Sequence, residues 1–337
     1  MLSRVFHEWE RRLAAAAENR VVRPFEWGLE WLAELGHRHG EDEWAQLEAW
    51  AEERVANSEA FFAVAPATEY VLHGDRLRFA SAVATPHPEN NIVHARYFPD
   101  GSPRGKRRAV VVLPQWNADE GGHVGLCRLL NRFGISALRL SLPYHDARMP
   151  PELLRADYIV SANIGRTVQV CRQAVLDARR AIQWLSQQGY ESIGILGTSL
   201  GSCLSMLTAA HEPLVRAAAL NHISPFFADV VWEGLSTQHV RKGLHGSIDL
   251  QRLRHVWMPI SPFPYLERVR GKRILLVYAR YDLTFPVQLS KMLVEEFRKR
   301  GVDYELSVLP CGHYTTGMAP FKWLDGLTLC RFLSRSL

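Results

Sequence analysis

The sequence predicts an α/β protein, with a mostly parallel central sheet, helices on both faces, a helical N-terminal extension and a lid insertion. The first observation behind this fold class is a change at about residue 108, after which apolar runs typical of buried strands alternate with helical segments. The second is a glycine-flanked serine, Ser199, which stands where an apolar run ends and a helical stretch begins. A strand, a tight turn and a helix in this order are typical of such sheets.

Each predicted element follows from a local pattern. Residues 109–113 and 274–278 are continuous apolar runs, as expected for strands covered on both faces. Residues 304–309 alternate apolar and polar side chains, which favours a strand nearer the sheet edge. Further strands are expected over 135–142, 192–196 and 215–221, and helices over 122–133, 164–188, 202–210, 286–300 and from Pro320 to the C-terminus. Consecutive units of this kind imply right-handed crossovers.

The residues before this alternation are of two kinds. The first 60 are rich in Ala, Glu and Leu and hold half of the ten tryptophans. This apolar content is too high for a free tail, so we expect helices that pack on the main body or on a second copy in a homodimer. Residues 70–98 predict two extended pieces around Pro86 and Pro88, in an antiparallel hairpin at a sheet edge.

Composition argues against several classes of function. The net charge of +5 comes from Lys and Arg residues scattered among Asp and Glu, without the basic block of a nucleic-acid-binding chain. The five cysteines show no Cys-x-x-Cys spacing, which favours free thiols in a reducing cytoplasm. The N-terminus is charged where a signal peptide is apolar, and no apolar stretch approaches the roughly 18 residues of a membrane span. We therefore expect a cytoplasmic protein.

The segment Gly197-Thr198-Ser199-Leu200-Gly201 is a Gly-x-Ser-x-Gly motif between a strand and a helix, the context of a nucleophile elbow. The glycines are needed because a Cβ would collide where strand and helix converge. Such a turn lifts the serine hydroxyl clear of the backbone and points unpaired helix N–H groups at the group that it attacks. The motif alone arises by chance in roughly a tenth of chains this long. The assignment therefore depends on finding an acid and a histidine that could act with Ser199.

An acid and a histidine follow two later strands. In open parallel sheets the reactive groups gather beyond the C-terminal ends of strands. Asp282 lies just beyond strand 273–278, and His313 lies just beyond strand 304–309. In the chain order Ser199, Asp282, His313, these residues supply a nucleophile, an orienting acid and a general base.

On these three motifs the sequence resembles the α/β-hydrolase superfamily, over about residues 70–330, and is most similar to its dienelactone-hydrolase-like and bacterial carboxylesterase-like members. The resemblance implies a hydrolase domain over 66–337, with 1–65 as the N-terminal extension. It implies ester chemistry that needs no metal and no organic cofactor.

The resemblance also implies an oxyanion hole. One donor would be the N–H of Leu200, directly after the nucleophile. The other would come from the loop after strand 109–113, where Trp116 is favoured by position and Gln115 is second. Many relatives carry His-Gly at the positions of Pro114 and Gln115, so this chain departs from the family pattern in that loop.

Each candidate also has a structural interpretation. Ser199 could be an ordinary helix N-cap, Asp282 could cap the helix that follows it, and His313 could fill a turn. His222, after the strand that precedes the lid, is the rival base and is expected instead to line the pocket or to be structural. Residues 119–123 could bind a metal, although helix capping is favoured.

Less of the sequence bears on the substrate. Residues 225–270 are too long for a simple connection and rich in aromatic side chains. Because the superfamily commonly carries a cap subdomain at this place, the resemblance implies a partly helical lid. Its aromatics, Trp232 among them, either line an apolar acyl pocket or form the core of the lid. Tyr144 and His222 are also expected at the substrate. Arg148 could bind a substrate carboxylate, although a surface salt bridge is favoured.

Together these features predict a serine hydrolase that cleaves carboxylic esters through an acyl-enzyme intermediate. An acyltransferase or a thioesterase would use the same triad with another acceptor or substrate. A non-catalytic interaction protein on the same scaffold is the alternative from a different class. The complete triad argues against that alternative, because a binding module needs no activated nucleophile.

Overall fold

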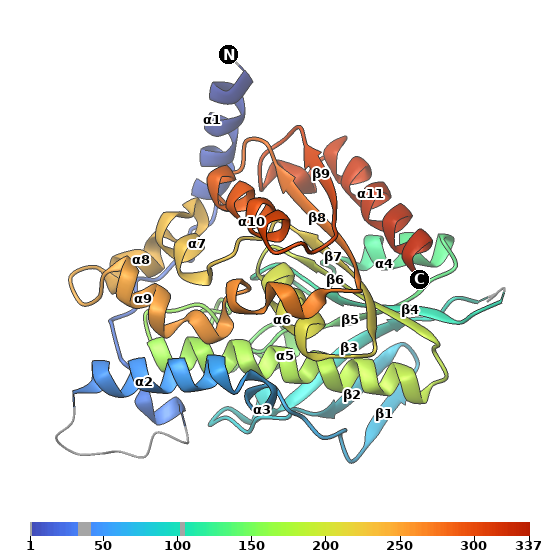
Figure 1. The fold of residues 1–337 in the computed structure, drawn as a ribbon, viewed down its shortest axis with the longest axis horizontal. Helices are drawn as coiled ribbons and strands as arrows, with labels where there is room; N and C mark the ends of the chain where they lie inside the picture. Colours follow the sequence, from blue (N-terminus) through green and yellow to red (C-terminus); the bar gives the residue numbers. More distant parts are fainter. Residues whose placement is uncertain (1, 33–41, 102–104) are drawn as a thin grey trace.

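The computed structural model describes residues 2–32, 42–101 and 105–337, and these form one mixed sheet with helices on both faces (Figure 1). The described strands are β1 (Tyr70–His73), β2 (Arg76–Ala80), β3 (Ile92–Phe98), β4 (Arg108–Leu113), β5 (Ser136–Leu140), β6 (Ser192–Thr198), β7 (Val215–Asn221), β8 (Arg273–Ala279) and β9 (Glu305–Leu309). Their order in the sheet is β1-β2-β3-β5-β4-β6-β7-β8-β9. The pairs β1–β2, β2–β3 and β3–β5 are antiparallel, and the other pairs are parallel. The predicted sheet, mostly parallel and with helices on both faces, is confirmed.

The helices follow the strands as the alternating pattern predicted. The described α-helices are α1 (Leu2–Ala15), α2 (Glu43–Ala56), α3 (Ser58–Phe61), α4 (Val124–Arg132), α5 (Ile164–Gln187), α6 (Leu200–His211), α7 (Phe227–Glu233), α8 (Gln238–Leu244), α9 (Leu250–Val256), α10 (Val287–Lys299) and α11 (Phe321–Ser336). The helices α4, α5, α6, α10 and α11 correspond to the five that the sequence predicted around the parallel strands, with small shifts at their ends.

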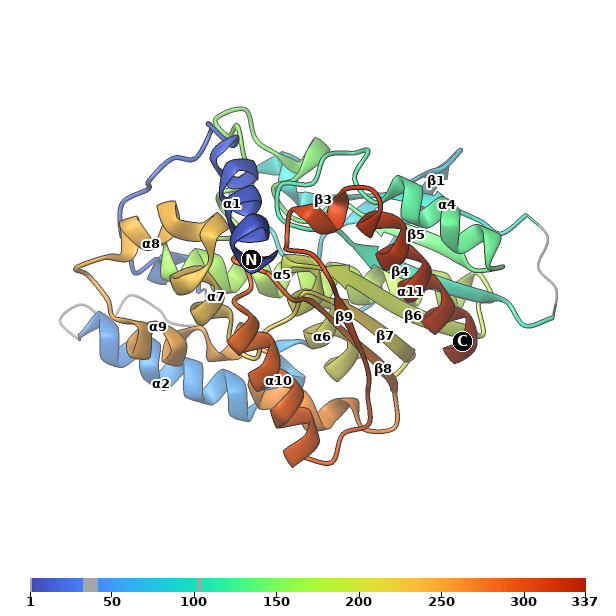
Figure 2. The ribbon, with the colours of Figure 1, turned by 90° about the horizontal axis from the view of Figure 1, so that it is seen from above.

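Alternating side chains of the parallel strands pack into two cores, one on each face of the sheet. Val110 and Val112 of β4 join a cluster with Leu130 of α4 and Phe332 of α11. Val111, between them, belongs to the cluster that contains α5 and α6. Figure 2 shows the two layers, with α4 and α11 on one side of the sheet and α6 and α10 on the other. Burial on both faces explains why these strands are continuous apolar runs.

The antiparallel part of the sheet differs from the prediction. Residues 70–98 contain three strands, where the sequence predicted two pieces. Gly74, with a φ of 61°, turns the chain between β1 and β2. Because every residue of β1 is at least partly exposed, no buried alternation marks it in the sequence.

The N-terminal segment packs on the body of the same chain. It forms α1, α2 and α3, whereas residues 16–28 between α1 and α2 contain no α-helix. Leu47 and Trp50 of α2 and Phe62 after α3 are buried in the core that lies on the α5 and α6 face. These contacts account for much of the apolar content that made a free tail improbable.

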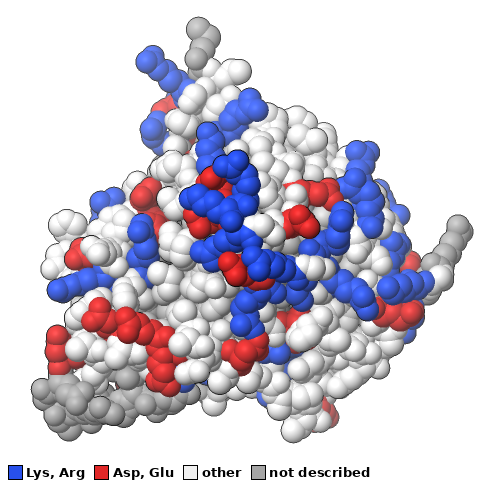
Figure 3. Space-filling model, in the orientation of Figure 1, with Lys and Arg blue, Asp and Glu red and all other residues white. Residues whose placement is uncertain are grey.

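Basic and acidic side chains are mixed on the face shown in Figure 3. Lys and Arg side chains gather there over α10. Arg298 pairs with Glu295 at 2.9 Å and Lys299 pairs with Glu296 at 3.0 Å, so acidic groups accompany the basic ones. Within the described ranges, no helix is both long enough and apolar enough to span a bilayer.

Arg148 is a structural residue, which corrects both interpretations of it. Its side chain is fully buried, and its Nη2 donates to Asp177 Oδ2 at 2.9 Å and to the Asn90 carbonyl oxygen at 2.7 Å. Nη1 donates to the Ser141 carbonyl oxygen at 3.1 Å. Arg148 therefore neither reaches a substrate nor forms a surface salt bridge. It ties the segment after β5 to α5 and to the segment before β3.

Candidate active site

Ser199 stands between β6 and α6 in a strained backbone conformation, with φ 57° and ψ −120°. A Cβ on Gly197 would lie 2.0 Å from the Gly201 carbonyl oxygen, and one on Gly201 would lie 2.1 Å from that of Leu113. The two glycines therefore let strand and helix converge. The Ser199 N–H donates to the Asn221 carbonyl oxygen at 2.8 Å, and the side chain makes no capping hydrogen bond. The hydroxyl is thus not used as a helix N-cap.

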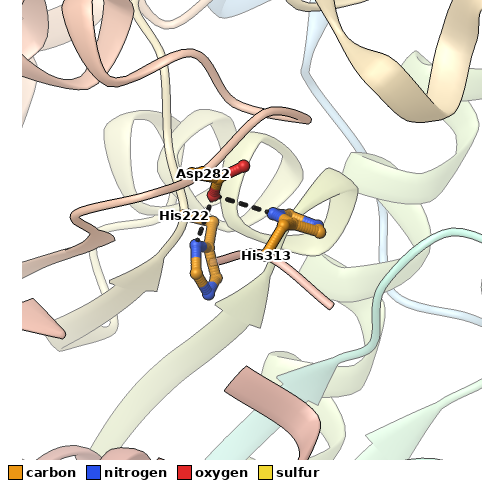
Figure 4. A group of neighbouring side chains, drawn as sticks. All are labelled: His222, Asp282 and His313. Carbon is orange, nitrogen blue, oxygen red and sulfur yellow. Dashed lines mark hydrogen bonds and ion pairs between the residues drawn. The ribbon is translucent and has the colours of Figure 1, made fainter. Parts of the chain in front are cut away.

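Asp282 and His313 form a hydrogen-bonded pair at the ends of β8 and β9 (Figure 4). His313 Nδ1–H donates to Asp282 Oδ2 at 2.9 Å. The other oxygen, Oδ1, accepts the main-chain N–H groups of Thr284 at 2.8 Å and Phe285 at 2.7 Å. The Phe285 ring stacks on the imidazole of His313, with centroids 5.4 Å apart and planes 3° apart. Asp282 therefore caps its own turn and also orients the histidine.

The pair is electrostatically coupled. Burial alone would raise the pKa of Asp282, but the charge of His313 and the hydrogen bonds from two histidines outweigh it and lower the pKa well below its ordinary value. Burial likewise opposes protonation of His313, yet the Asp282 carboxylate raises the pKa of His313 above its ordinary value. Asp282 is therefore ionised at neutral pH. Its carboxylate keeps the proton of neutral His313 on Nδ1, which leaves a lone pair on Nε2.

His222 is a second histidine on the same carboxylate oxygen. It follows β7 with a φ of 58°, and its Nδ1 lies 2.9 Å from Asp282 Oδ2 (Figure 4). The rings of His222 and His313 have centroids 4.6 Å apart. Burial lowers the pKa of His222, so the neutral ring donates its Nδ1–H to the carboxylate. Its Nε2 is buried and has no hydrogen-bond partner in the described part of the chain.

The three side chains could also be considered as metal ligands, since one ligand atom of each lies within 4.8 Å of the others. Both imidazoles, however, present Nδ1 to the same oxygen of Asp282. The carboxylate accepts a hydrogen bond from each ring in this geometry, whereas a metal needs the lone pair of each ligating nitrogen. The contacts therefore fit a carboxylate that accepts hydrogen bonds from two histidines better than they fit a metal site.

The loop after β4 is anchored by buried polar contacts. The Asn117 N–H donates to His145 Nε2 at 2.9 Å, and Asn117 Oδ1 accepts the Ala156 N–H at 2.9 Å. Trp116 Nε1–H donates to the Ala156 carbonyl oxygen, also at 2.9 Å. Burial lowers the pKa of His145 to about 4, so the ring stays neutral and its Nε2 can accept. These contacts hold the loop beside the elbow.

A cavity of about 1140 Å³ brings most of the expected site residues together. Its lining includes Ser199, Leu200, His313, His222, Trp116 and Gln115. In the described structure, the main-chain N–H groups of Leu200, Trp116 and Gln115 donate to no protein acceptor. These N–H groups therefore lack an acceptor in the described part of the chain, which an oxyanion hole requires of its donors. One apolar wall comes from the start of the segment between β7 and β8, through Phe226, Phe227, Val230 and Val231.

Tyr144 and Trp232, both expected at the substrate, lie elsewhere. Tyr144 is fully buried, and its hydroxyl lies 3.0 Å from His87 Nδ1. Trp232 packs under the guanidinium of Arg241, which lies 5.2 Å from the ring centroid. Neither is among the described residues that line the cavity. The helix α7 turns Val230 and Val231 toward the cavity, and Trp232 follows one position later on another side.

The sequence did not point to Glu10, which contacts the histidine loop from α1. Its side chain is fully buried, and Oε2 accepts the Tyr314 N–H at 2.9 Å. Oε1 accepts the Thr315 N–H at 3.0 Å and the Thr315 hydroxyl at 2.9 Å. Glu10 also contributes to the raised pKa of His313. A charged residue in an amphipathic helix predicts solvent exposure, so no local signal could have identified it.

The fold is similar to those of several solved structures. The acetyl xylan esterase from Paenibacillus sp. R4 has a TM-score of 0.63 at 14% sequence identity, over 87% of this chain and 99% of that one. The acetyl xylan esterase 1 from Thermoanaerobacterium sp. JW/SL YS485 has a TM-score of 0.59 at 15% identity, over 91% of this chain and 99% of that one.

The acylaminoacyl peptidase from Pyrococcus horikoshii has a TM-score of 0.61 at 15% identity, over 83% of this chain. This chain spans 44% of that peptidase. No family model and no curated protein matches the sequence. At such low identity the likeness concerns the fold, and it shows that the chain has the α/β-hydrolase fold, as the resemblance implied.

Proposed function

We propose that the protein is a serine hydrolase that cleaves carboxylic esters through Ser199, His313 and Asp282. The observation that carries the proposal is that one cavity holds a strained, uncapped serine at the end of β6 and a histidine bonded to a buried carboxylate. A strained turn persists only where the surrounding structure holds it in place, and such turns cluster at functional sites. The folds of the two acetyl xylan esterases support ester substrates.

In the proposed acylation step, Ser199 Oγ attacks the ester carbonyl carbon while His313 Nε2 accepts the hydroxyl proton. The carbonyl oxygen becomes an oxyanion, and the Leu200 N–H stabilises it together with the Trp116 or the Gln115 N–H. The ionised Asp282 stabilises the imidazolium of His313. His313 then protonates the leaving alcohol, and an acyl group remains on Ser199.

In the proposed deacylation step, His313 takes a proton from water, and the resulting hydroxide attacks the acyl carbonyl. Collapse of the second oxyanion releases the carboxylic acid and returns the proton to Ser199 Oγ. The apolar wall from Phe226 to Val231 would hold the acyl chain, and we propose that 225–270 acts as the lid of this pocket.

The experiment is p-nitrophenyl acetate hydrolysis by the purified protein, followed across pH with and without methanol as a competing acceptor. We expect p-nitrophenol release, with acetate as the main product. The value of kcat/KM should be highest where His313 is neutral and should fall as the pH drops through its raised pKa, because the imidazolium cannot accept the serine proton. Acetyl transfer to methanol in preference to water would instead indicate an acyltransferase. A folded protein that releases no p-nitrophenol at any pH would contradict the proposal.

A further inference from the structure

Cationic side chains outnumber acidic ones in the lining of the cavity. Among the described lining residues, the cations are Arg20, Arg128, Arg132, Arg155 and Lys322, and the one carboxyl is Asp325. Burial raises the pKa of Asp325 to about 7, so this carboxyl is only partly ionised at neutral pH. The charged side chains that line the cavity are therefore mainly cationic, which favours an anionic ligand beside them.

Arg20 and Arg155 are less exposed than the other cations, since Arg155 is buried and Arg20 is half-buried, whereas Arg128, Arg132 and Lys322 are exposed. Arg155 is 8% exposed, and burial lowers its pKa. Its Nη1 donates to Asn19 Oδ1 at 2.9 Å, and Arg20 Nη2 donates to the Tyr314 hydroxyl at 3.0 Å. The Nε atoms of both arginines are buried without a hydrogen-bond partner in the described structure. Each guanidinium thus has a buried N–H group without a hydrogen-bond acceptor, and both side chains line the cavity.

The charge of this cluster is not balanced by its nearest carboxylate. Asp157 Oδ1 forms an ion pair with Arg155 Nε at 3.4 Å, and Asp157 Oδ2 accepts from Arg23 Nε at 3.2 Å. The Asp157 carboxylate therefore pairs with both Arg23 and Arg155, and Arg20 adds a third positive charge. Burial, followed by the charges of Arg155 and Arg20, lowers the pKa of the neighbouring His239 to about 4. Like charges held together in this way are stabilised when an anion binds.

Each arginine contacts a residue that belongs to, or is next to, the proposed catalytic groups. The guanidinium carbon of Arg155 lies 5.0 Å from the ring centroid of Trp116, whose main chain is a candidate oxyanion donor. Arg20 bonds the hydroxyl of Tyr314, the residue after His313. An anion bound between Arg20 and Arg155 therefore occupies the same cavity as an ester held at Ser199.

We propose that Arg20 and Arg155 form an anion subsite, and that the substrates are esters carrying a second, anionic oxyacid group, either a carboxylate or a phosphate. Guanidinium groups bind both oxyanions through paired N–H donors, and charge-assisted hydrogen bonds of this kind are among the strongest in proteins. The subsite names the substrate class of the proposed hydrolase and rests on that function. Because Arg20 lies within residues 16–28, the proposal also makes this segment part of the substrate site.

The test compares two pairs of esters, in each of which one member is anionic and the other is neutral. The carboxylate pair is p-nitrophenyl hydrogen glutarate and its neutral methyl ester, and the phosphate pair is dibutyrylglycerol phosphate and tributyrin. We expect kcat/KM to favour the anionic member of at least one pair by about tenfold or more. The pair that shows the preference identifies the oxyanion.

The variants Arg20→Gln and Arg155→Met should reduce this preference toward unity. Arg155 is buried and Arg20 is half-buried, so Arg20→Gln keeps the test valid if Arg155→Met does not fold. The matched control is Arg241→Met, which removes one positive charge outside the cavity lining and should retain the preference. Equal kcat/KM values within both pairs, or a preference that survives Arg20→Gln, would overturn the proposal.

A binding measurement separates this subsite from the esterase proposal. Glutarate or glycerol phosphate should raise the thermal midpoint of the wild-type protein, and the shift should be smaller in Arg20→Gln. A midpoint shift without ester turnover would support the subsite and contradict the esterase. Turnover of the neutral esters without any shift or anionic preference would support the esterase and contradict the subsite.

Discussion

Replacing His313 by Ala should lower kcat for p-nitrophenyl acetate by about 10⁴-fold or more, because Ser199 then has no base to accept its proton. His313 is the histidine whose Nδ1 is bound to Asp282 and whose ring is stacked on Phe285, so its position is fixed for this role. The measurement is steady-state hydrolysis at a pH where wild-type activity is maximal, together with a thermal midpoint to verify folding.

The matched control is His222→Ala, since both histidines donate to the same oxygen of Asp282. We expect a smaller loss for His222→Ala, about tenfold to a hundredfold, which corresponds to one hydrogen bond to a charged group. If His222→Ala cost more activity than His313→Ala, the base would be His222 and the assignment would be wrong. Partial recovery of His313→Ala by added imidazole would further support the role of His313 as a base.

The second large effect is expected for Asp282→Asn, with a loss in kcat of about 10³- to 10⁴-fold at neutral pH. Asp282 is surrounded by donors, two main-chain N–H groups on Oδ1 and two imidazole N–H groups on Oδ2. An amide in this place must turn its NH₂ toward one of these pairs. If the NH₂ faces the histidines, His313 must carry its proton on Nε2 and cannot accept one from Ser199.

The same substitution should also reduce stability, by about 1–3 kcal/mol for each buried donor left unpaired. Activity and denaturation midpoints are therefore measured together, and kcat is taken under conditions where the variant is folded. The control is Asp119→Asn, which changes a carboxyl whose Oδ1 accepts the Gly122 N–H at 2.8 Å in the turn before α4. A loss of activity in Asp119→Asn comparable to that in Asp282→Asn would identify Asp119 as the acid.

The parts of the fold and of the site that could be predicted are those with local causes. The parallel strands are apolar throughout because helices cover both faces, and this pattern is visible in the sequence. Gly197 and Gly201 are required by contacts within the elbow itself. The proximity of Asp282 and His313 could be predicted because reactive groups gather at the C-terminal ends of parallel strands, which is a rule of topology.

The parts that could not be predicted depend on contacts between distant segments. Glu10 reaches Thr315 from 305 positions away in the sequence, and nothing near either residue indicates the contact. Tyr144 and Trp232 were expected at the substrate because they lie in suitable segments, but the direction of each side chain is decided by tertiary packing. Arg148 was expected in a surface salt bridge. Its burial depends on the contact with Asp177, which lies 29 positions away and which the sequence near Arg148 does not indicate.

The protein should first be treated with a fluorophosphonate probe, with Ser199→Ala as the matched variant, and the adduct should be located by mass spectrometry. An activated Ser199 Oγ displaces fluoride and forms a bond to phosphorus, so we expect one adduct on the peptide that contains Ser199 and no such adduct in the variant. Labelling should weaken as the pH falls through the raised pKa of His313. A well-folded protein that remains unlabelled, or is labelled equally in Ser199→Ala, would show that Ser199 is not an activated nucleophile.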